Sequence, residues 1–134
     1  MTLSWFVPGP VVPKARARTV VLPNGKRSSY TPARTRAYEE LIGQHYRAAY
    51  PGRKMIPAGI PLSVEVVAWL KPQKGRAWPT GRPDGDNLCK AACDAATGLV
   101  FADDAQVVRM VVEKRYSGAP TGQGMEITVR LMGV

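Results

Sequence analysis

The stretch LSVEVVAWL, residues 62–70, is the clearest strand in the sequence. Its valines carry branched Cβ atoms, which favour the pleated conformation of a β-sheet. On its amino-terminal side a helix is expected to run from Thr31-Pro32 to about Ala49, with Thr31 as the N-cap and Pro32 at the first helical position. The apolar spacing predicts that one stripe of this helix is buried, formed by Tyr38, Leu41, Ile42, His45 and Tyr46.

Further elements follow on both sides of this strand. Pro23-Asn24-Gly25 is a turn signal, and it predicts a basic hairpin between residues 16–22 and 26–30. A second helix is expected to be capped by Asp86 or Asn87 and to end at about Thr97, because Gly98 is a typical stop. Short strands are expected at residues 3–7, 107–112 and 125–132, and a loop at 71–83. This order predicts one small α/β or α+β domain over residues 1–134.

Composition excludes several classes of protein. The chain has 134 residues, of which 45% are hydrophobic and 22% charged, and this is typical of a globular domain. No apolar run is long enough to span a membrane, and the first residues do not resemble a secretion signal. Two cysteines, Cys89 and Cys93, cannot form a disulfide framework, so a reducing cytoplasm is the expected compartment. We expect both to be free thiols that face the core. Glycine-rich nucleotide-binding loops are absent, so no organic cofactor is expected.

Charge is the unusual property of the chain. Nineteen Lys and Arg residues against ten Asp and Glu residues give a net charge of +9. Seven bases and no acid lie between Met1 and Ala37, and four bases and no acid lie between Lys71 and Arg82. Such basic runs favour a polyanionic partner, most often nucleic acid. Trp78, inside the second run, could stack on a base or a sugar.

All five aspartates lie between Asp84 and Asp104. Asp84 and Asp86 are two residues apart, so in extended backbone both carboxylates point to one side. A helix that reverses the chain could bring Asp104 back towards them. Clustered carboxylates beside bases are typical of a divalent-metal site next to an anionic substrate.

Each of these residues also has a plainer interpretation. Asp84 and Asp86 could be helix caps, and Asp103-Asp104 could be a turn. Lys90 is four residues from both Asp86 and Asp94, so it could form salt bridges along the helix or neutralise charge on a scissile phosphate. His45, the one histidine, is expected to be a packed helix residue.

The segment RPDGDNLCK (82–90), followed by Asp94, Gly98 and DDAQVV (103–108), resembles the RusA family of Holliday junction resolvases, endodeoxyribonucleases that are common in phages and prophages. The segment PKARAR (13–18) and Tyr30-Thr31-Pro32 also look like a common branch of this family. The resemblance implies a small mixed sheet packed by two helices, a homodimer and dependence on Mg²⁺, with Mn²⁺ as an alternative ion.

By position, the resemblance implies that Asp84, Asp86 and Asp104 bind the metal and that Lys90 is the catalytic lysine. Asn87, Asp94 and Asp103 belong to the motif and are candidates for supporting the metal ligands; for Asp94, orientation of Lys90 is favoured over direct ligation. Gln106 also belongs to the motif, and its role is open. The expected clamp on DNA phosphates consists of Lys14, Arg16, Arg18, Lys71, Lys74, Arg76 and Arg82.

These expectations describe an enzyme that resolves four-way DNA junctions in the cytoplasm of a bacterial or phage-infected cell. A metal-activated water would attack the phosphodiester, and a two-fold dimer would make paired symmetric nicks. Two alternatives stay open at this point. One is a nuclease of the same chemistry that acts on flaps, forks or other branched DNA, and the other is a DNA-binding protein without catalysis.

Overall fold

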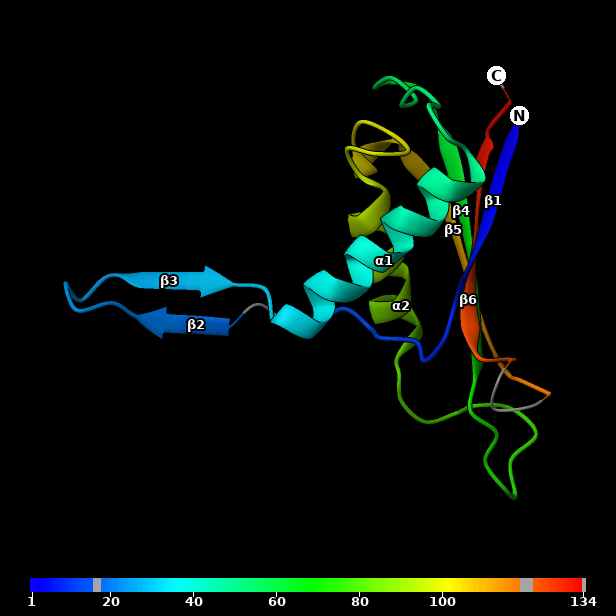
Figure 1. Ribbon diagram of the computed structural model, residues 1–134, viewed down its shortest axis with the longest axis horizontal. Helices are drawn as coiled ribbons and strands as arrows, with labels where there is room; N and C mark the ends of the chain where they lie inside the picture. The colour runs from blue at the N-terminus through cyan, green and yellow to red at the C-terminus, as the bar shows by residue number, and fades with distance from the viewer. Residues whose placement is uncertain (16–17, 119–121, 134) are drawn as a thin grey trace.

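A computed structural model describes residues 1–15, 18–118 and 122–133 of the chain (Figure 1). Its elements in chain order are β1 (Thr2–Pro8), β2 (Arg18–Val21), β3 (Arg27–Tyr30), α1 (Ala33–Ala49), β4 (Leu62–Leu70), α2 (Gly85–Ala96), a short 3-10 helix η1 (Asp104–Gln106), β5 (Val107–Tyr116) and β6 (Gly124–Leu131).

The main sheet has four strands in the order β1-β6-β4-β5. β6 is antiparallel to both β1 and β4, whereas β4 and β5 are parallel. Parallel neighbours cannot be joined by a tight turn, so the chain must cross back over the sheet between them. α2 is that crossover, and the expected mixed sheet is therefore confirmed.

Both helices cover the same face of the sheet, so the domain has two layers (Figure 1). In β1 the side chains alternate between buried and exposed, and the buried set is Leu3, Trp5 and Val7. The indole Nε1 of Trp5 donates to the carbonyl of Ile42 in α1 at 3.2 Å, which ties this strand to the helix layer. The core is completed by apolar side chains of both helices and of the two central strands, chiefly Tyr38, Ile42, Tyr46, Val64, Val66, Leu88, Cys89, Ile127 and Val129.

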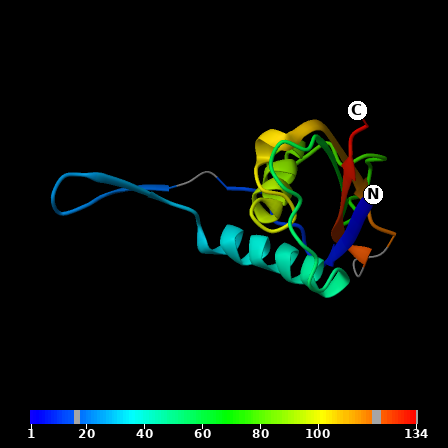
Figure 2. The ribbon, with the colours of Figure 1, turned by 90° about the horizontal axis from the view of Figure 1, so that it is seen from above.

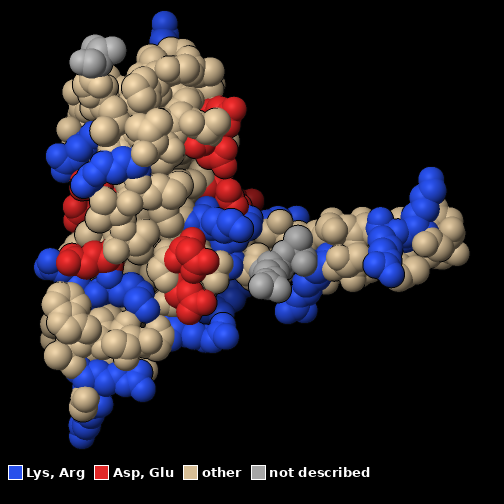
Figure 3. All heavy atoms as spheres, turned by 180° about the vertical axis from the view of Figure 1, so that it is seen from behind, with Lys and Arg blue, Asp and Glu red and all other residues tan. Residues whose placement is uncertain are grey.

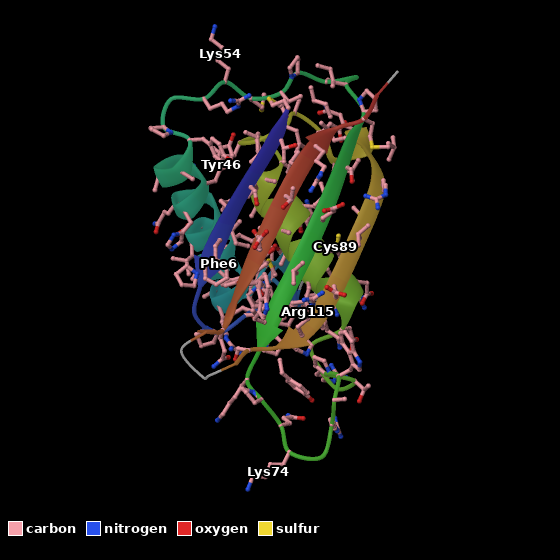
Figure 4. The ribbon with its side chains drawn as sticks, turned by 90° about the vertical axis from the view of Figure 1, so that its right-hand side faces the viewer. Phe6, Tyr46, Lys54, Lys74, Cys89 and Arg115 are labelled. Carbon is pink, nitrogen blue, oxygen red and sulfur yellow. The ribbon has the colours of Figure 1, made fainter. Side chains whose placement is uncertain are left out.

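None of the helices in the described residues covers the other face of the sheet, as Figure 4 shows from that side. Phe6 and Trp69 meet there edge to face, with ring centroids 6.1 Å apart. Trp69 is half-buried, because its position in β4 points it away from the helices. Gly124 lies beside this pair, and a side chain at that position would collide with Phe6.

The β2–β3 hairpin extends away from the body of the domain (Figure 2). Its strands pair with each other, from Arg18 opposite Tyr30 to Val21 opposite Arg27. Every residue of the two strands is exposed, including Val21 at 70%. The Asn-Gly turn and the hairpin that it predicts are confirmed.

Most expected elements are present, and the differences lie at their ends. The strand at 62–70 and the end of α1 at Ala49 agree with the expectation, while β5 continues to Tyr116. Pro32 is the N-cap of α1 rather than its first residue. α2 begins at Gly85, before the expected caps Asp86 and Asn87, and an acid in the first turn of a helix complements its dipole. Among the described residues, no helix is long and apolar enough to cross a membrane.

Tyr38 in α1 and Tyr50, the C-cap of α1, differ in whether their hydroxyl groups are hydrogen-bonded. Tyr38 is 4% exposed, and burial raises its pKa to about 12. Its hydroxyl finds no hydrogen-bond partner in the described part of the chain. The hydroxyl of Tyr50 instead accepts from the Ser4 amide at 2.9 Å and donates to the Ser4 carbonyl at 3.1 Å. It thereby satisfies both backbone groups of Ser4 on the edge strand β1.

We predict that Tyr38→Phe raises the free energy of unfolding by about 1 kcal/mol, because an unpaired buried hydroxyl is removed. The same change at Tyr50 should lower the free energy of unfolding by about 1 kcal/mol, because two backbone groups of an edge strand lose their partner. Urea unfolding of the two variants measures both effects. A loss of stability in Tyr38→Phe would mean that its hydroxyl is hydrogen-bonded after all.

Candidate active site

Asp84 and Asp86 lie where the chain enters α2. Asp84 is the N-cap residue, but its side chain makes no capping hydrogen bond, and Asp86 lies in the first turn. Neither carboxylate forms an ion pair with a described residue. Asp84 therefore takes the cap position without a capping hydrogen bond, and both carboxylates are exposed to solvent.

A lysine of β5 holds the approach to this helix in place. Nζ of Lys114 donates to the carbonyl of Gly81 at 2.8 Å and to the carbonyl of Pro83 at 3.0 Å. Two carbonyls of the segment before Asp84 are thus fixed from the sheet. The sequence pattern did not point to Lys114, because nothing in its spacing links it to a loop some thirty residues earlier.

The solvent-exposed face of α2 carries Asp86, Lys90 and Asp94 at intervals of four residues. Lys90 is exposed and forms no ion pair with the described residues, so the salt bridges that were its alternative interpretation are not seen. Asp94 is paired instead with Lys14, at 3.0 Å. The favoured idea that Asp94 orients Lys90 is not supported by this geometry.

Lys14 has a structural partnership that its place in the basic run did not predict. Its ammonium also contacts Glu39 of α1 at 2.7 Å, and its amide donates to the carbonyl of Asn87 at 3.0 Å. Burial alone would lower the pKa of Lys14, but hydrogen bonds to Glu39 and Asp94 outweigh this and raise it. Lys14 therefore joins the segment after β1 to both helices, and its charge is already neutralised.

A cavity of about 580 Å³ opens beside Asp84. Asn87 and the arginines Arg18, Arg34 and Arg82 also line it, while Lys14 lies in its wall. Arg18 and Arg82 were expected to contact DNA, and Arg34 was not singled out. Figure 3 shows bases gathered where the hairpin joins the body of the domain. This cavity places cationic side chains next to a carboxylate at the start of α2.

The Asp103-Asp104 pair divides into a structural and an exposed member. Asp103 is the N-cap of η1, and its side chain accepts from the Ala105 amide at 3.0 Å. Gln106 completes a capping box by accepting from the Asp103 amide, and its own amide donates to the carbonyls of Pro57 and Ile60. The turn interpretation is confirmed for Asp103. Gln106 fastens this turn to the loop between α1 and β4. The carboxylate of Asp104 stays exposed and unpaired among the described residues.

Asp104 does not meet Asp84 and Asp86 within the described chain. α2 lies between them, and Asp104 is near enough to Cys93 to affect the pKa of that thiol. Cys93 is seven residues after Asp86, which corresponds to about 10 Å along a helix. No three His, Cys, Asp or Glu side chains of the described residues lie together as a metal site. The expected return of Asp104 to the other two aspartates is therefore not seen in a single chain.

Most of the remaining residues that were expected to contact DNA lie apart from the cavity, in the loop after β4. Lys71, Lys74 and Arg76 are exposed in the loop after β4, and Lys74 is at its tip, beyond the end of the sheet (Figure 4). Trp78 in the same loop is 58% exposed, as stacking on nucleic acid would require. Arg16 lies outside the described residues.

The cysteines and the histidine are as expected. Cys89 and Cys93 are free and buried in the core. Their mutual hydrogen bond and burial raise the pKa of Cys93, which keeps it a thiol. His45 is half-buried on α1.

We predict that Lys14→Met lowers the free energy of unfolding by roughly 1 kcal/mol near neutral pH, because Glu39 and Asp94 lose their shared cation. The raised pKa of Lys14 gives the sign of the pH dependence: the stabilisation is complete below the unfolded pKa of about 10.5 and is lost as pH rises through the folded pKa. Thermal unfolding of both proteins between pH 7 and 11 measures this. Equal stability at pH 7, with weaker DNA binding in the variant, would return Lys14 to the DNA clamp.

Comparison with known proteins adds two findings. The family model for endodeoxyribonuclease RusA matches residues 8–130. An uncharacterized protein of Bacillus subtilis (strain 168), YqaN, is 42% identical over 60 residues, which is 45% of this chain and 40% of that protein. The match thus spans less than half of the length of this relative. The family model covers both the carboxylate segment and most of the sheet, and the chain therefore belongs to the RusA family of endodeoxyribonucleases.

Proposed function

We propose that this chain is a Mg²⁺-dependent, structure-selective DNA endonuclease that resolves Holliday junctions by paired symmetric nicks. The observation that carries the proposal is the unneutralised pair Asp84 and Asp86 beside a cavity lined by arginines. In a chain of net charge +9, two exposed carboxylates without a cation partner are suited to bind a metal ion. Family membership supports the same activity. We expect the protein to act in the bacterial cytoplasm, where its DNA substrate lies.

The donor set fits Mg²⁺ in its chemistry. Mg²⁺ takes oxygen ligands, commonly one or two carboxylates together with substrate phosphates and water, and Mn²⁺ accepts similar ligands. Asp84 and Asp86 are the residues of one chain that would hold it, and Asn87 is next to them in the cavity wall. When bound, such an ion polarises a phosphoryl oxygen and lowers the pKa of water.

The other side chains would act on the DNA strand itself. Lys90, one helical turn after Asp86 and without an ion-pair partner among the described residues, would stabilise the charge that develops on the phosphodiester. Arg18 and Arg82 would hold phosphates beside the cut, and Lys71, Lys74 and Arg76 would bind a more distant part of the duplex. Asp94 and Asp103 would support the site through Lys14 and through η1 rather than by contact with the metal ligands.

Asp104 would contribute from a second copy of the chain. Because α2 separates it from Asp84 and Asp86, a homodimer in which the partner subunit's Asp104 approaches this pair would reconcile all three aspartates with one metal site. A two-fold dimer would also present two equivalent sites to the two strands of a junction.

We predict that the protein nicks a synthetic four-way junction in Mg²⁺ and leaves a linear duplex of the same sequence intact. Asp86→Asn should reduce the rate roughly 100-fold or more, because a ligand that stabilises the transition state is lost. Chelator should abolish cleavage. Glu113→Gln is the matched control, because it also removes one carboxylate, but from an acid that pairs with Arg115 on β5. The cleavage rate of this variant should equal that of the wild-type protein.

Gel analysis of labelled junctions, flaps and forks measures these rates. Faster cleavage of a flap or a fork than of the junction would shift the substrate to other branched DNA. Tight binding without cleavage in Mg²⁺ or Mn²⁺ would contradict the enzymatic proposal and favour a DNA-binding protein.

We predict that a mixed dimer of one Asp86→Asn subunit and one Asp104→Asn subunit still makes a single nick. If the site is shared between subunits, both substitutions fall in one site and the other stays intact. Two differently tagged subunits, co-expressed and purified through both tags, supply this dimer. Complete loss of nicking, with single nicks retained by a dimer of one wild-type and one Asp86→Asn subunit, would place Asp104 in the site of its own chain.

A further inference from the structure

We propose that the cavity beside Asp84 is a phosphate-binding site, and that Arg34 of α1 is its anchoring residue. The ligand would be a backbone phosphate of the DNA strand that is cut, next to the scissile phosphate. This inference rests on the proposed function for the identity of the strand. The phosphate site itself follows from the charge and shape of the cavity.

The cavity holds an excess of unneutralised positive charge. Arg18, Arg34 and Arg82 line it from three separate segments, the start of β2, the start of α1 and the loop before α2. None of the three forms an ion pair within the described part of the chain. Among the described residues that line the cavity, Asp84 supplies one carboxylate against these three arginines. Guanidinium groups brought together in this way repel one another unless an anion is bound between them.

The start of α1 adds to this positive field. No side chain caps α1, and its first turn contains no acid. The first amides of a helix lack partners within the helix and carry the positive end of its dipole, so this end favours acids over bases. Arg34 is nevertheless the second residue of α1, where it works against the stability of the free protein. An anion in the cavity would convert the same arrangement into a favourable one.

The shape of the cavity suits a phosphate of a strand. Its volume of about 580 Å³ exceeds what one phosphate needs and leaves room for the adjoining sugar. The Lys14 amide, bonded to the Asn87 carbonyl at 3.0 Å, closes the wall between the segment after β1 and α2. Arginine can bind two phosphate oxygens at once through its planar guanidinium group, so three arginines can fix the strand in one position.

A second hollow of about 540 Å³ between the two helices provides the contrast. Arg36 and Arg47 line it, but so do three acids, Glu39, Glu40 and Asp94. Positive charge is therefore balanced in that hollow, and it makes no case for an anion. Arg36 is two residues from Arg34 on the same helix, which makes it a matched control.

The test is binding of a four-way junction by Asp86→Asn protein, which avoids cleavage, over a range of salt. Arg34→Gln in this background should weaken binding about tenfold and reduce the slope of log affinity against log salt by about one. Arg36→Gln should change affinity less than twofold. The melting temperature of free Arg34→Gln should equal or exceed that of the parent, because an unfavourable base leaves the helix start. Arg34→Lys should fall between the parent and Arg34→Gln.

Junctions with one neutral methylphosphonate linkage locate the phosphate. One position near the cut should weaken binding to the parent protein and have no further effect on Arg34→Gln. A terminal 5′-phosphate on the same strand and free inorganic phosphate are the other arms. If the effect of Arg34→Gln depended on the terminal 5′-phosphate or on inorganic phosphate, and no internal linkage were sensitive, the assignment to a backbone phosphate would be overturned. Equal losses in Arg34→Gln and Arg36→Gln would overturn the site itself.

These outcomes are separable from failure of the proposed function. If the wild-type protein binds the junction but never cuts it, the difference between Arg34→Gln and Arg36→Gln still decides whether the cavity binds phosphate. If the protein cuts the junction and both variants cut equally fast at limiting DNA, the endonuclease stands and the phosphate site does not.

Discussion

The parallel pairing of β4 with β5 is the constraint on which the rest of the molecule depends. It requires the chain to leave one end of β4, cross the sheet and enter β5 at the opposite end, and α2 is the rigid part of that crossing. The loop that leads from β4 into α2 therefore lies at one end of the sheet, and the turn between α2 and β5 lies at the other. The separation of Asp84 from Asp104 follows from this connection rather than from any local preference of the residues. In the proposed homodimer, a second copy of the chain would bring these two residues together.

Around this crossover, single polar side chains hold the connecting segments in place. Lys114 fixes the carbonyls before α2, Gln106 fixes the turn after it, and Lys14 fastens the segment after β1 against both helices. Each of these side chains satisfies two or three groups at once, so removing one would leave several polar groups without partners. The candidate site is thus preorganised by residues that have no direct part in its chemistry. The carboxylates Asp84 and Asp86, by contrast, are left without such partners among the described residues.

The sequence was informative wherever a signal is local. Alternation and β-branched residues located β4, and the Asn-Gly turn located the hairpin, because both depend on residues close in the chain. The start of α2 differs from the expectation, because Asp84, Asp86 and Asn87 are all residue types that cap helices and the sequence does not decide among them. The ion pairs of Lys14 could not be predicted, because its partners Glu39 and Asp94 are far along the chain. Residue types and motif spacing identified the candidate carboxylates, but the distances between them depend on the sheet topology, which spacing does not encode.

The exposed hairpin has a consequence for how this architecture can change over time. Since neither of its faces packs on the core, its length and its side chains can vary with little effect on whether the domain folds. The crossover helix is under the opposite condition, because its apolar side chains pack in the core and it carries the carboxylates at its start. Mutation can therefore explore new contacts at the periphery while the centre stays constant. A protein organised in this way can acquire a different target without rebuilding the machinery that acts on it.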